Sequence, residues 1–221
     1  ASAGEQGALG IVLHPRFKKT KWLYVMYTNA SPEEMRVTRF TVRQNRCRSA
    51  RTIMANVPAS SGYHNGGQLE FVGNKLFVST GENHDPGAAQ STTNRLGKIL
   101  RYNADGSVPS TNPFSAPGNP NPVWSYGHRN PFGLARRPGT SKLYETENGP
   151  SCDDEMNVIK KGRRELRVSN LDKPFWPDEG ITKGDLLAYY RDVAPALVPH
   201  LRDRPFTMKR YPDGWSGKFF F

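Results

Sequence analysis

The stretch QLEFVGNKLFVST, residues 68–80, consists of two short runs of apolar and β-branched residues separated by Gly73-Asn74. Glycine and asparagine readily accept the positive φ angles that a two-residue β-hairpin turn requires, whereas most other residues do not. We therefore expect Gln68–Val72 and Lys75–Thr80 to form a pair of antiparallel strands.

Similar short runs occur on both sides of this hairpin, separated by Gly, Pro, Asn and Asp. Runs of this composition, bounded by turn residues, are typical of β-strands. The further predicted strands are Gly10–Leu13, Trp22–Thr28, Val37–Val42, Lys98–Tyr102, Val123–Tyr126 and Lys142–Thr146. No convincing helical period lies between them, which favours antiparallel sheets in a sandwich, a barrel or a propeller. A propeller would bring the loops on one face of its blades to a central site.

The pattern changes after Gly162. Thr182-Lys-Gly-Asp185 resembles a helix capping box, with Asp in place of the usual Glu. Apolar residues follow at helical spacing and predict an amphipathic helix: Leu186, Leu187, Tyr190, Val193 and Leu197. Pro195 and Pro199 are expected to distort the end of this helix. We therefore expect a β-rich part up to Gly162, followed by a short α+β part.

The composition is that of a globular protein. Of the 221 residues, 36% are hydrophobic and 11% are aromatic, which is enough for a packed core. No run of about eighteen apolar residues occurs, so no membrane span is predicted. The N-terminal sequence ASAGEQGALG lacks the basic and apolar regions of a signal peptide, and the compartment is left open.

The net charge of +11 raises the question of nucleic-acid binding, because clustered Lys and Arg neutralise phosphates. Residues 163–221 contain 11 Lys and Arg against 8 Asp and Glu, so +8 of the total belongs to residues 1–162. Neither part is a basic tract, and we interpret most of these charges as a solvated surface. The two cysteines, Cys47 and Cys152, lack metal-ligand spacing, and whether they form a disulfide is left open.

Three polar clusters adjoin predicted strands: YHNGGQ at residues 63–68, SYGHRNP at 125–131 and ENGPSCDDE at 147–155. Taken alone, His64 is either a general base or a hydrogen-bonded surface histidine, and Arg129 is either a ligand contact or a salt-bridge partner. The acidic residues of the third cluster equally suit a solvated turn. The glycines beside His64 allow a close backbone approach, which suits a ligand site and a tight turn alike.

These clusters occur in one order together with GEQGALGIVLHPRF at residues 4–17 and GKILRYNADGSVPSTNPF at residues 97–114. In this combination they closely resemble the soluble aldose and glucose dehydrogenases that depend on pyrroloquinoline quinone (PQQ), the glucose/sorbosone dehydrogenase family. The resemblance covers about residues 4–162. It implies a mainly β fold, a six-bladed β-propeller with PQQ at its centre and calcium completing the site. It also implies an aldose sugar as substrate and an external electron acceptor.

The resemblance further implies roles for particular residues. His64 matches the general base that takes the proton of the anomeric hydroxyl as hydride passes to the quinone. Arg129 and Asn130 match the pair that contacts the quinone oxygens, where a positive charge stabilises developing negative charge. Gly149 and Pro150 match residues whose backbone carbonyls bind the calcium ion.

A polar residue beside the cofactor is also implied near the N-terminus. Glu5 matches this position, where the family has Gln or Glu. Because Gln6 is adjacent, a shift of the match by one residue would exchange the two.

The resemblance stops after DDEMNVIKKG, residues 153–162. The family pattern continues with Asn-Tyr-Gly-Trp-Pro, whereas this sequence continues with RRELRVSNLDKPFW at residues 163–176. We therefore expect about half of the blades, without the basic residues that hold the PQQ carboxylates and without the aromatic wall of the sugar pocket. Because an open propeller exposes sheet edges, we expect low stability and no useful activity for this truncated chain alone; a non-catalytic propeller fragment is the alternative.

Residues 164–221 closely resemble the opening of the polymerase domain of bacterial DNA ligase D, from ELRVSNLDKPFW to the final FFF. The resemblance implies that Asn170, Lys173 and Lys183 contact the DNA 5′-phosphate. It also implies that Phe220 and Phe221 contact the DNA end. The metal-binding carboxylates of the polymerase are not among these residues. We expect weak 5′-phosphate binding without polymerisation, in a chimeric chain whose join is either biological or an artefact.

Overall fold

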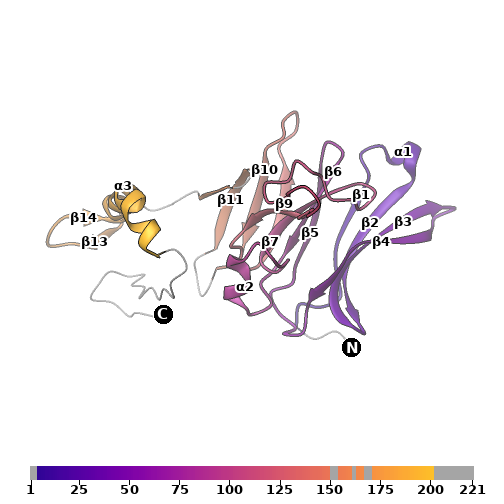
Figure 1. The fold of residues 1–221 in the computed structure, drawn as a ribbon, viewed down its shortest axis with the longest axis horizontal. Coiled ribbons are helices and arrows are strands. Elements are labelled where there is room, and N and C mark those ends of the chain that lie inside the picture. Colours follow the sequence, from indigo (N-terminus) through magenta and orange to yellow (C-terminus); the bar gives the residue numbers. More distant parts are fainter. Residues whose placement is uncertain (1–3, 150–153, 161–162, 167–170, 202–221) are drawn as a thin grey trace. The chain divides into compact units, whose positions relative to one another are not determined.

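The structure of the protein is a computed structural model. It describes residues 4–149, 154–160, 163–166 and 171–201 (Figure 1). The chain divides into two compact units, Ala1–Arg167 and Val168–Phe221, and each unit is described by itself.

Among its described residues, the first unit contains three four-stranded antiparallel sheets, each a meander of consecutive strands. The first sheet consists of β1 (Ala8–Leu13), β2 (Trp22–Ala30), β3 (Glu33–Arg43) and β4 (Arg46–Pro58). The second consists of β5 (Gly66–Val72), β6 (Lys75–Thr80), β7 (Lys98–Asn103) and β8 (Val123–Tyr126). The third consists of β9 (Pro131–Arg136), β10 (Leu143–Glu147), β11 (Glu155–Lys160) and β12 (Arg163–Leu166). Two short helices, α1 (Phe17–Thr20) and α2 (Pro86–Gln90), lie in the connections.

The first strands of the three sheets lie side by side. Strand β1 packs against β5, and β5 packs against β9 (Figure 1). Four-stranded meanders whose first strands line a common interior are the blades of a β-propeller. The predicted fold class, mainly β and a partial propeller, is therefore confirmed, and the three blades of the described residues are half of the predicted six.

The hairpin predicted from residues 68–80 is confirmed, with Val72 opposite Lys75 and Gly73 at a φ of 58°. The other predicted strands also occur, with their ends shifted by a few residues. Strands β4, β9, β11 and β12 were not predicted. The first half of β4, RCRSART, is polar and exposed, so it lacks the alternation that marks a half-buried strand.

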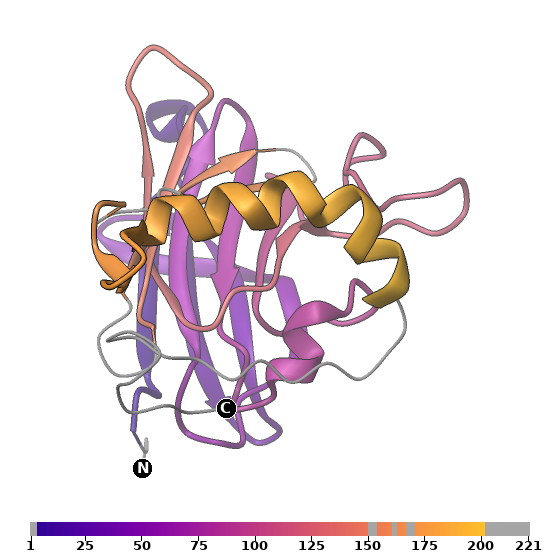
Figure 2. The same ribbon diagram turned by 90° about the vertical axis from the view of Figure 1, so that its left-hand side faces the viewer.

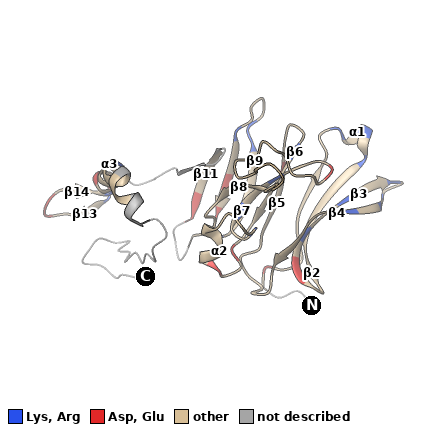
Figure 3. Cartoon of the chain, viewed as in Figure 1, with Lys and Arg blue, Asp and Glu red and all other residues tan. Residues whose placement is uncertain are grey.

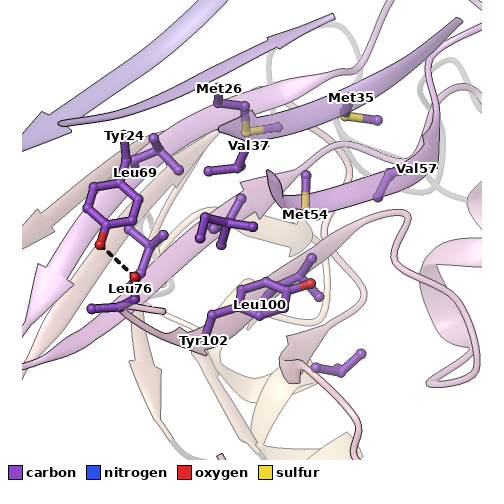
Figure 4. Close-up of a cluster of buried hydrophobic side chains, with 14 of the residues drawn as sticks. Tyr24, Met26, Met35, Val37, Met54, Val57, Leu69, Leu76, Leu100 and Tyr102 are labelled. Atoms are coloured by element: carbon purple, nitrogen blue, oxygen red, sulfur yellow. Dashed lines mark hydrogen bonds between the residues drawn. The ribbon is translucent and has the colours of Figure 1, made fainter. Parts of the chain in front are cut away.

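Apolar side chains from facing strands hold the sheets together. The larger cluster lies between the first and second sheets, because alternate residues of both sheets point into the space between them (Figure 4). Its fully buried members include Tyr24, Met26, Val37, Leu76 and Leu100. Each such side chain contributes about 1.5–3 kcal/mol by leaving water. A smaller cluster joins the second and third sheets: Phe77, Ile99, Leu134, Leu143 and Ile159.

The second unit contains a short hairpin, β13 (Pro174–Trp176) and β14 (Ile181–Thr182), followed by α3 (Lys183–Leu201). The predicted capping box is confirmed. Asp185 Oδ2 accepts hydrogen bonds from the N–H and the hydroxyl of Thr182, at 2.9 and 2.7 Å, and the Asp185 N–H donates to Thr182 Oγ1 at 3.3 Å. These bonds lower the pKa of Asp185. The helix continues past Pro195 and Pro199, and Figure 2 shows its last turns inclined to the preceding ones.

The predicted boundary at Gly162 lies outside the described residues and stays a prediction. Just after it, β12 pairs with β11, with Arg163 opposite Lys160, so these residues form the fourth strand of the third sheet. The two compact units divide after Arg167.

Within the described ranges, no helix is both long and apolar enough to cross a membrane. Cys47 is exposed on β4 and its thiol is free. Cys152 lies outside the described residues, so the disulfide question stays where the sequence left it.

Candidate active site

Three of the predicted site residues come from different loops at one end of the β-sheets. Glu5 precedes β1, His64 precedes β5 and Asn130 precedes β9. Because the first strands of the three sheets lie side by side, the residues directly before them are brought together. Residues as far apart in the sequence as Glu5 and Asn130 thereby meet in one site.

The carboxylate of Glu5 links these loops. Its Oε2 accepts a hydrogen bond from the backbone N–H of His64 at 2.8 Å and another from Asn130 Nδ2 at 3.1 Å. Asn130 Oδ1 in turn accepts from the Gly66 N–H at 3.0 Å. The side chain of Asn130 is buried and bonded at both ends of its amide, so Asn130 is a structural link between loops. Its predicted contact with the quinone stays a prediction.

The imidazole of His64 is held by a buried carboxylate. His64 Nδ1 lies 2.6 Å from Glu82 Oε1, and only 12% of the His64 side chain and 5% of the Glu82 side chain are exposed. The backbone of His64 has a φ of 53°, which is uncommon for a residue other than glycine. A Cβ atom on Gly81 would lie 1.9 Å from the His64 carbonyl oxygen, so this approach requires glycine. Since Nδ1 faces Glu82, Nε2 is the ring nitrogen on the side away from this bond.

Glu82 was not predicted as a site residue, although the predicted hairpin contains the signal. Strand β6 ends at Thr80, which lies opposite Gly66 at the start of β5. A residue just after β6 is therefore beside a residue just before β5, which places Glu82 next to His64. The Glu82 N–H also donates to the carbonyl of Arg129 at 2.9 Å, which joins this pair to the loop before β9.

His84 is a second residue that sequence reasoning did not find. Its ring centroid lies 4.2 Å from that of His64 and 5.9 Å from that of Tyr63, on which it stacks. Both His84 and Tyr63 are exposed. They form an aromatic rim beside the buried His64–Glu82 pair.

Arg129 lies against the loop that is predicted to bind calcium. Its Nη1 donates to the carbonyl of Asn148 at 3.1 Å and to that of Gly149 at 3.3 Å. The Gly149 N–H donates to Asp154 Oδ1 at 3.2 Å. Arg129 and Gly149 are thus brought together, whereas Pro150 lies outside the described residues.

A buried group of ionisable side chains lies next to Arg129. His128 Nδ1 is 3.6 Å from Glu147 Oε2 and 3.9 Å from Glu145 Oε2, and all three side chains are at most 4% exposed. The second ring nitrogen of His128 is 2.9 Å from Ser125 Oγ. Glu147 Oε2 accepts the backbone N–H of Arg129 at 2.8 Å. The potential ligand atoms of the three residues lie within 4.8 Å of one another, so this group has the composition and spacing of a metal site.

The DNA-binding residues predicted for the second unit are only partly described. Asn170, Phe220 and Phe221 lie outside the described residues. Lys173 directly precedes β13 and Lys183 is the first residue of α3, and the Lys183 N–H donates to the Lys173 carbonyl at 2.8 Å. The structure therefore brings these two lysines together.

The fold and the loop-end residues define a partial β-propeller with a histidine-centred candidate active site. The chain belongs to the glucose/sorbosone dehydrogenase family, because the family model "Glucose / Sorbosone dehydrogenase" matches residues 1–164. It is 33% identical to the aldose sugar dehydrogenase YliI of Escherichia coli over 72% of this chain and 45% of that protein. It is 30% identical to quinoprotein glucose dehydrogenase B of Acinetobacter calcoaceticus over 98% of this chain and 51% of that protein.

Solved structures agree with this assignment. The PQQ-bound form of aldose sugar dehydrogenase from Streptomyces coelicolor matches with a TM-score of 0.67 and 31% identity, over 82% of this chain and 53% of that one. The resemblance predicted for the first part of the sequence is confirmed. The chain spans about half the length of the curated relatives it matches.

The C-terminal residues match a different family. The model of the LigD primase-polymerase domain matches residues 182–221. The multifunctional non-homologous end joining protein LigD of Mycolicibacterium smegmatis is 41% identical over 56 residues, which are 25% of this chain and 7% of that protein. The second predicted resemblance is therefore confirmed over this short segment.

Proposed function

We propose that this chain carries the histidine-centred part of a PQQ-dependent site that oxidises an aldose sugar at its anomeric carbon. The observation that carries the proposal is the His64–Glu82 pair, with 2.6 Å between Nδ1 and Oε1, on loops joined by Glu5 and Asn130. Oxidation of a sugar hydroxyl needs a base for the proton and an acceptor for the hydride. Family membership and the PQQ-bound relative support PQQ as that acceptor.

His64 would act as the base through Nε2. It takes the proton of the anomeric hydroxyl while the carbon–hydrogen bond breaks and a carbonyl forms, so the aldose becomes a lactone. PQQ, when bound, supplies the two-electron acceptor for the hydride. Glu82 accepts the Nδ1–H of His64, which orients the ring and stabilises the imidazolium that forms. An external electron acceptor completes the turnover.

Arg129 would stabilise negative charge that develops on the quinone oxygens. Its guanidinium is already oriented by the carbonyls of Asn148 and Gly149. A carbonyl oxygen has two lone pairs, so Gly149 can accept from Arg129 and still contribute to a calcium site. Oxygen donors of this kind suit calcium, and we propose calcium as the second cofactor, with Pro150 as a further ligand from the resemblance.

Binding of PQQ to the full chain tests the proposal without requiring complete turnover. We expect calcium-dependent binding in equilibrium dialysis, and reduction of one equivalent of PQQ by an aldose in a single turnover. Arg129→Ala should weaken binding about tenfold or more, because a hydrogen bond to a charged group contributes about 1.5–3 kcal/mol. The exposed Arg137→Ala is the control. A folded sample that does not bind PQQ would contradict the proposal and support a non-catalytic propeller fragment.

The rate of repeated turnover is a separate part of the proposal. Because the resemblance does not place the residues for the PQQ carboxylates and for the sugar-pocket wall in this chain, we propose that it has little or no steady-state activity alone. A dye-reduction assay with PQQ, calcium and glucose measures this. Turnover comparable to that of a complete aldose dehydrogenase would contradict it.

DNA 5′-phosphate binding by the second unit is a second candidate function. It is supported by the LigD match and by the hydrogen bond that places Lys173 beside Lys183 at the start of α3. The proposed contacts also include Asn170, Phe220 and Phe221. Comparison of 5′-phosphorylated and unphosphorylated duplexes tests this function, with tighter binding of the phosphorylated duplex expected. Equal affinities would exclude it.

A further inference from the structure

The β3–β4 hairpin is strongly basic. Between Glu34 and Glu70 the sequence contains neither an acidic residue nor a lysine, but it contains six arginines: Arg36, Arg39, Arg43, Arg46, Arg48 and Arg51. Figure 3 shows blue segments on β3 and β4 and on the neighbouring α1. From the sequence alone these charges suggest a solvated surface. The strand register shows instead that most of these arginines lie on one face of the hairpin.

Five of the six arginines lie on the same face of the hairpin. Arg43 is opposite Arg46, Thr41 is opposite Arg48, and Arg39 is opposite Arg51. Directly opposed residues of antiparallel strands share a face, and so do residues two apart on one strand. Because β4 has one extra residue between Arg48 and Arg51, Arg51 lies opposite Arg39 and on the same face as Arg48. The sixth, Arg36, lies on the other face and pairs with Glu34.

The inner pair of arginines is tied to the protein. The guanidinium of Arg39 lies 4.0 Å above the ring of Trp22, and its Nη1 donates to the Ala104 carbonyl at 3.4 Å. Arg51 is near enough to Asp105 to contribute to the lowered pKa of that carboxyl, which hydrogen bonds from Ser107 lower most. These contacts anchor the base of the hairpin.

The outer three arginines extend beyond these contacts. Arg43, Arg46 and Arg48 are exposed, and none of them forms an ion pair with another residue in the part of the chain that the structure describes. Arg43 and Arg48 line a hollow of about 510 Å³ together with Gln44 and Ser49. Guanidinium groups bind phosphate oxygens through paired hydrogen bonds, and amide and hydroxyl groups add further donors. The hollow thus has the donors of an oxyanion site.

The surrounding surface favours nucleic acid over a protein or a membrane. The exposed residues between Arg43 and Thr52 are arginines and small or polar residues, with no large apolar side chain among them. Protein interfaces have an apolar centre, and proteins that lie on membranes insert apolar side chains. Contact with a phosphodiester backbone needs neither, because neutralised phosphates release counterions.

We propose that Arg43, Arg46 and Arg48, together called the arginine face, bind the phosphodiester backbone of nucleic acid without reading its sequence. The backbone of Lys21 lies beside the hairpin, because its carbonyl accepts the N–H of Val42 at 2.7 Å. On β4, Arg46 and Arg48 are two residues apart, which is about 7 Å along the strand, and Arg43 of β3 lies opposite Arg46. This spacing suits a repeating anion better than a single one.

The arginine face is separate from the candidate active site. Strand β3 begins at Glu33, which bonds to Gln6 beside the site residue Glu5. The strand ends at Arg43, which is about 33 Å away along an extended chain. Nucleic-acid binding can therefore be measured, and can fail, independently of PQQ chemistry.

Fluorescence anisotropy with a labelled duplex tests the proposal on the full chain. The duplex lacks 5′-phosphates, so that the 5′-phosphate contacts proposed for the second unit are not formed. With three phosphate contacts, the logarithm of the affinity should fall with the logarithm of the salt concentration at a slope of about −2.7. The affinity should therefore fall about 40-fold between roughly 50 and 200 mM salt.

The double variant Arg43→Ala/Arg48→Ala should reduce that slope to about −0.9, because one contact remains. The control Arg137→Ala/Lys142→Ala removes the same charge from the exposed β9–β10 turn and should leave the slope unchanged. If the alanine variant unfolds, Arg43→Gln/Arg48→Gln keeps the side-chain length and should give the same loss. Any of three results would overturn the proposal. The variant and the control could show equal losses, the chain could bind heparin or anionic vesicles more tightly than the duplex, or it could fail to bind the duplex at about 50 mM salt.

Discussion

The two ends of the β-rich unit present polar side chains in opposite ways. At the loop end, Glu5, His64, Glu82 and Asn130 are at least partly buried and bonded to one another. At the hairpin end, the arginine face is exposed and forms no ion pair with a described residue. The first arrangement fixes atoms in place, which catalysis needs. The second leaves charges available to a partner, which electrostatic binding needs.

Removal of the His64 imidazole, the central group of the loop end, should have the largest effect on the reaction rate. His64→Ala deletes the proposed base, and general bases contribute about 10²- to 10⁴-fold to rate. We expect a loss of this size in the single-turnover reduction of PQQ by an aldose. PQQ binding in dialysis should change little, since the ring is proposed to act on the sugar. An unchanged rate would remove His64 from the mechanism.

Glu82→Gln tests whether the bonded network positions the base. The amide can still accept a hydrogen bond from Nδ1–H, but it no longer stabilises the imidazolium with a negative charge. We expect a loss of about tenfold or more in the single-turnover rate, with the sugar concentration at half-maximal rate little changed. Asp85→Asn, an exposed acid three residues away, is the control. An effect on sugar affinity alone would contradict a role in orienting His64.

Glu5 and Gln6 provide a direct test of the bonded network, and of the one-residue ambiguity in the sequence match. Glu5→Ala leaves the His64 N–H and Asn130 Nδ2 without their acceptor, and should lower the free energy of unfolding by about 2–4 kcal/mol. Gln6→Ala removes a bond to the Ala59 carbonyl and one to Glu33, and should cost about 1 kcal/mol. Urea unfolding measures both. A larger cost at Gln6 would show that Gln6, and not Glu5, is the main link between the loops.

The hairpin and the capping box were predictable because their signals are local. Gly73-Asn74 specifies a turn, and Thr182 and Asp185 complete a motif of four residues. The convergence of Glu5, His64 and Asn130 was available only through the family resemblance, because it depends on which strands are neighbours.

What the sequence did not predict depends on register. Glu82 meets His64 only because Gly66 lies opposite Thr80. The group of His128, Glu145 and Glu147 combines a loop with alternate residues of β10, a strand that was predicted with its start one residue too early. The arginine face depends on the pairing of Arg43 with Arg46 and of Thr41 with Arg48. The first half of β4 is polar and resembles a loop, so this pairing was not predicted. Side-chain spacing along the sequence carries no information on such cross-strand pairs.

Two buried tyrosines of the core allow a comparison between a hydrogen-bonded and an unbonded hydroxyl group. Tyr24 Oη donates to the Ala104 carbonyl at 2.7 Å, whereas Tyr102 Oη has no hydrogen-bond partner among the described residues. Tyr24→Phe should therefore cost about 1 kcal/mol at pH 7, and Tyr102→Phe should be neutral or slightly stabilising. Urea unfolding, with the exposed Tyr126→Phe as control, measures the difference. Equal costs would show that a bonded hydroxyl stabilises this core no more than an unbonded one.

The pH dependence of the same variants completes the test. Burial raises the pKa of both Tyr24 and Tyr102 to about 12, because the phenolate would lose its hydration. In the unfolded chain the pKa is about 10, so the folded state binds more protons between these values. The stability that these two protonated tyrosines give to the folded state is therefore fully present below about pH 10. It is lost as the pH rises through about 12. Tyr24→Phe and Tyr102→Phe should each reduce this alkaline loss of stability. A loss that persists undiminished in both variants would show that other groups cause it, and that the two hydroxyls differ only in their hydrogen bonding.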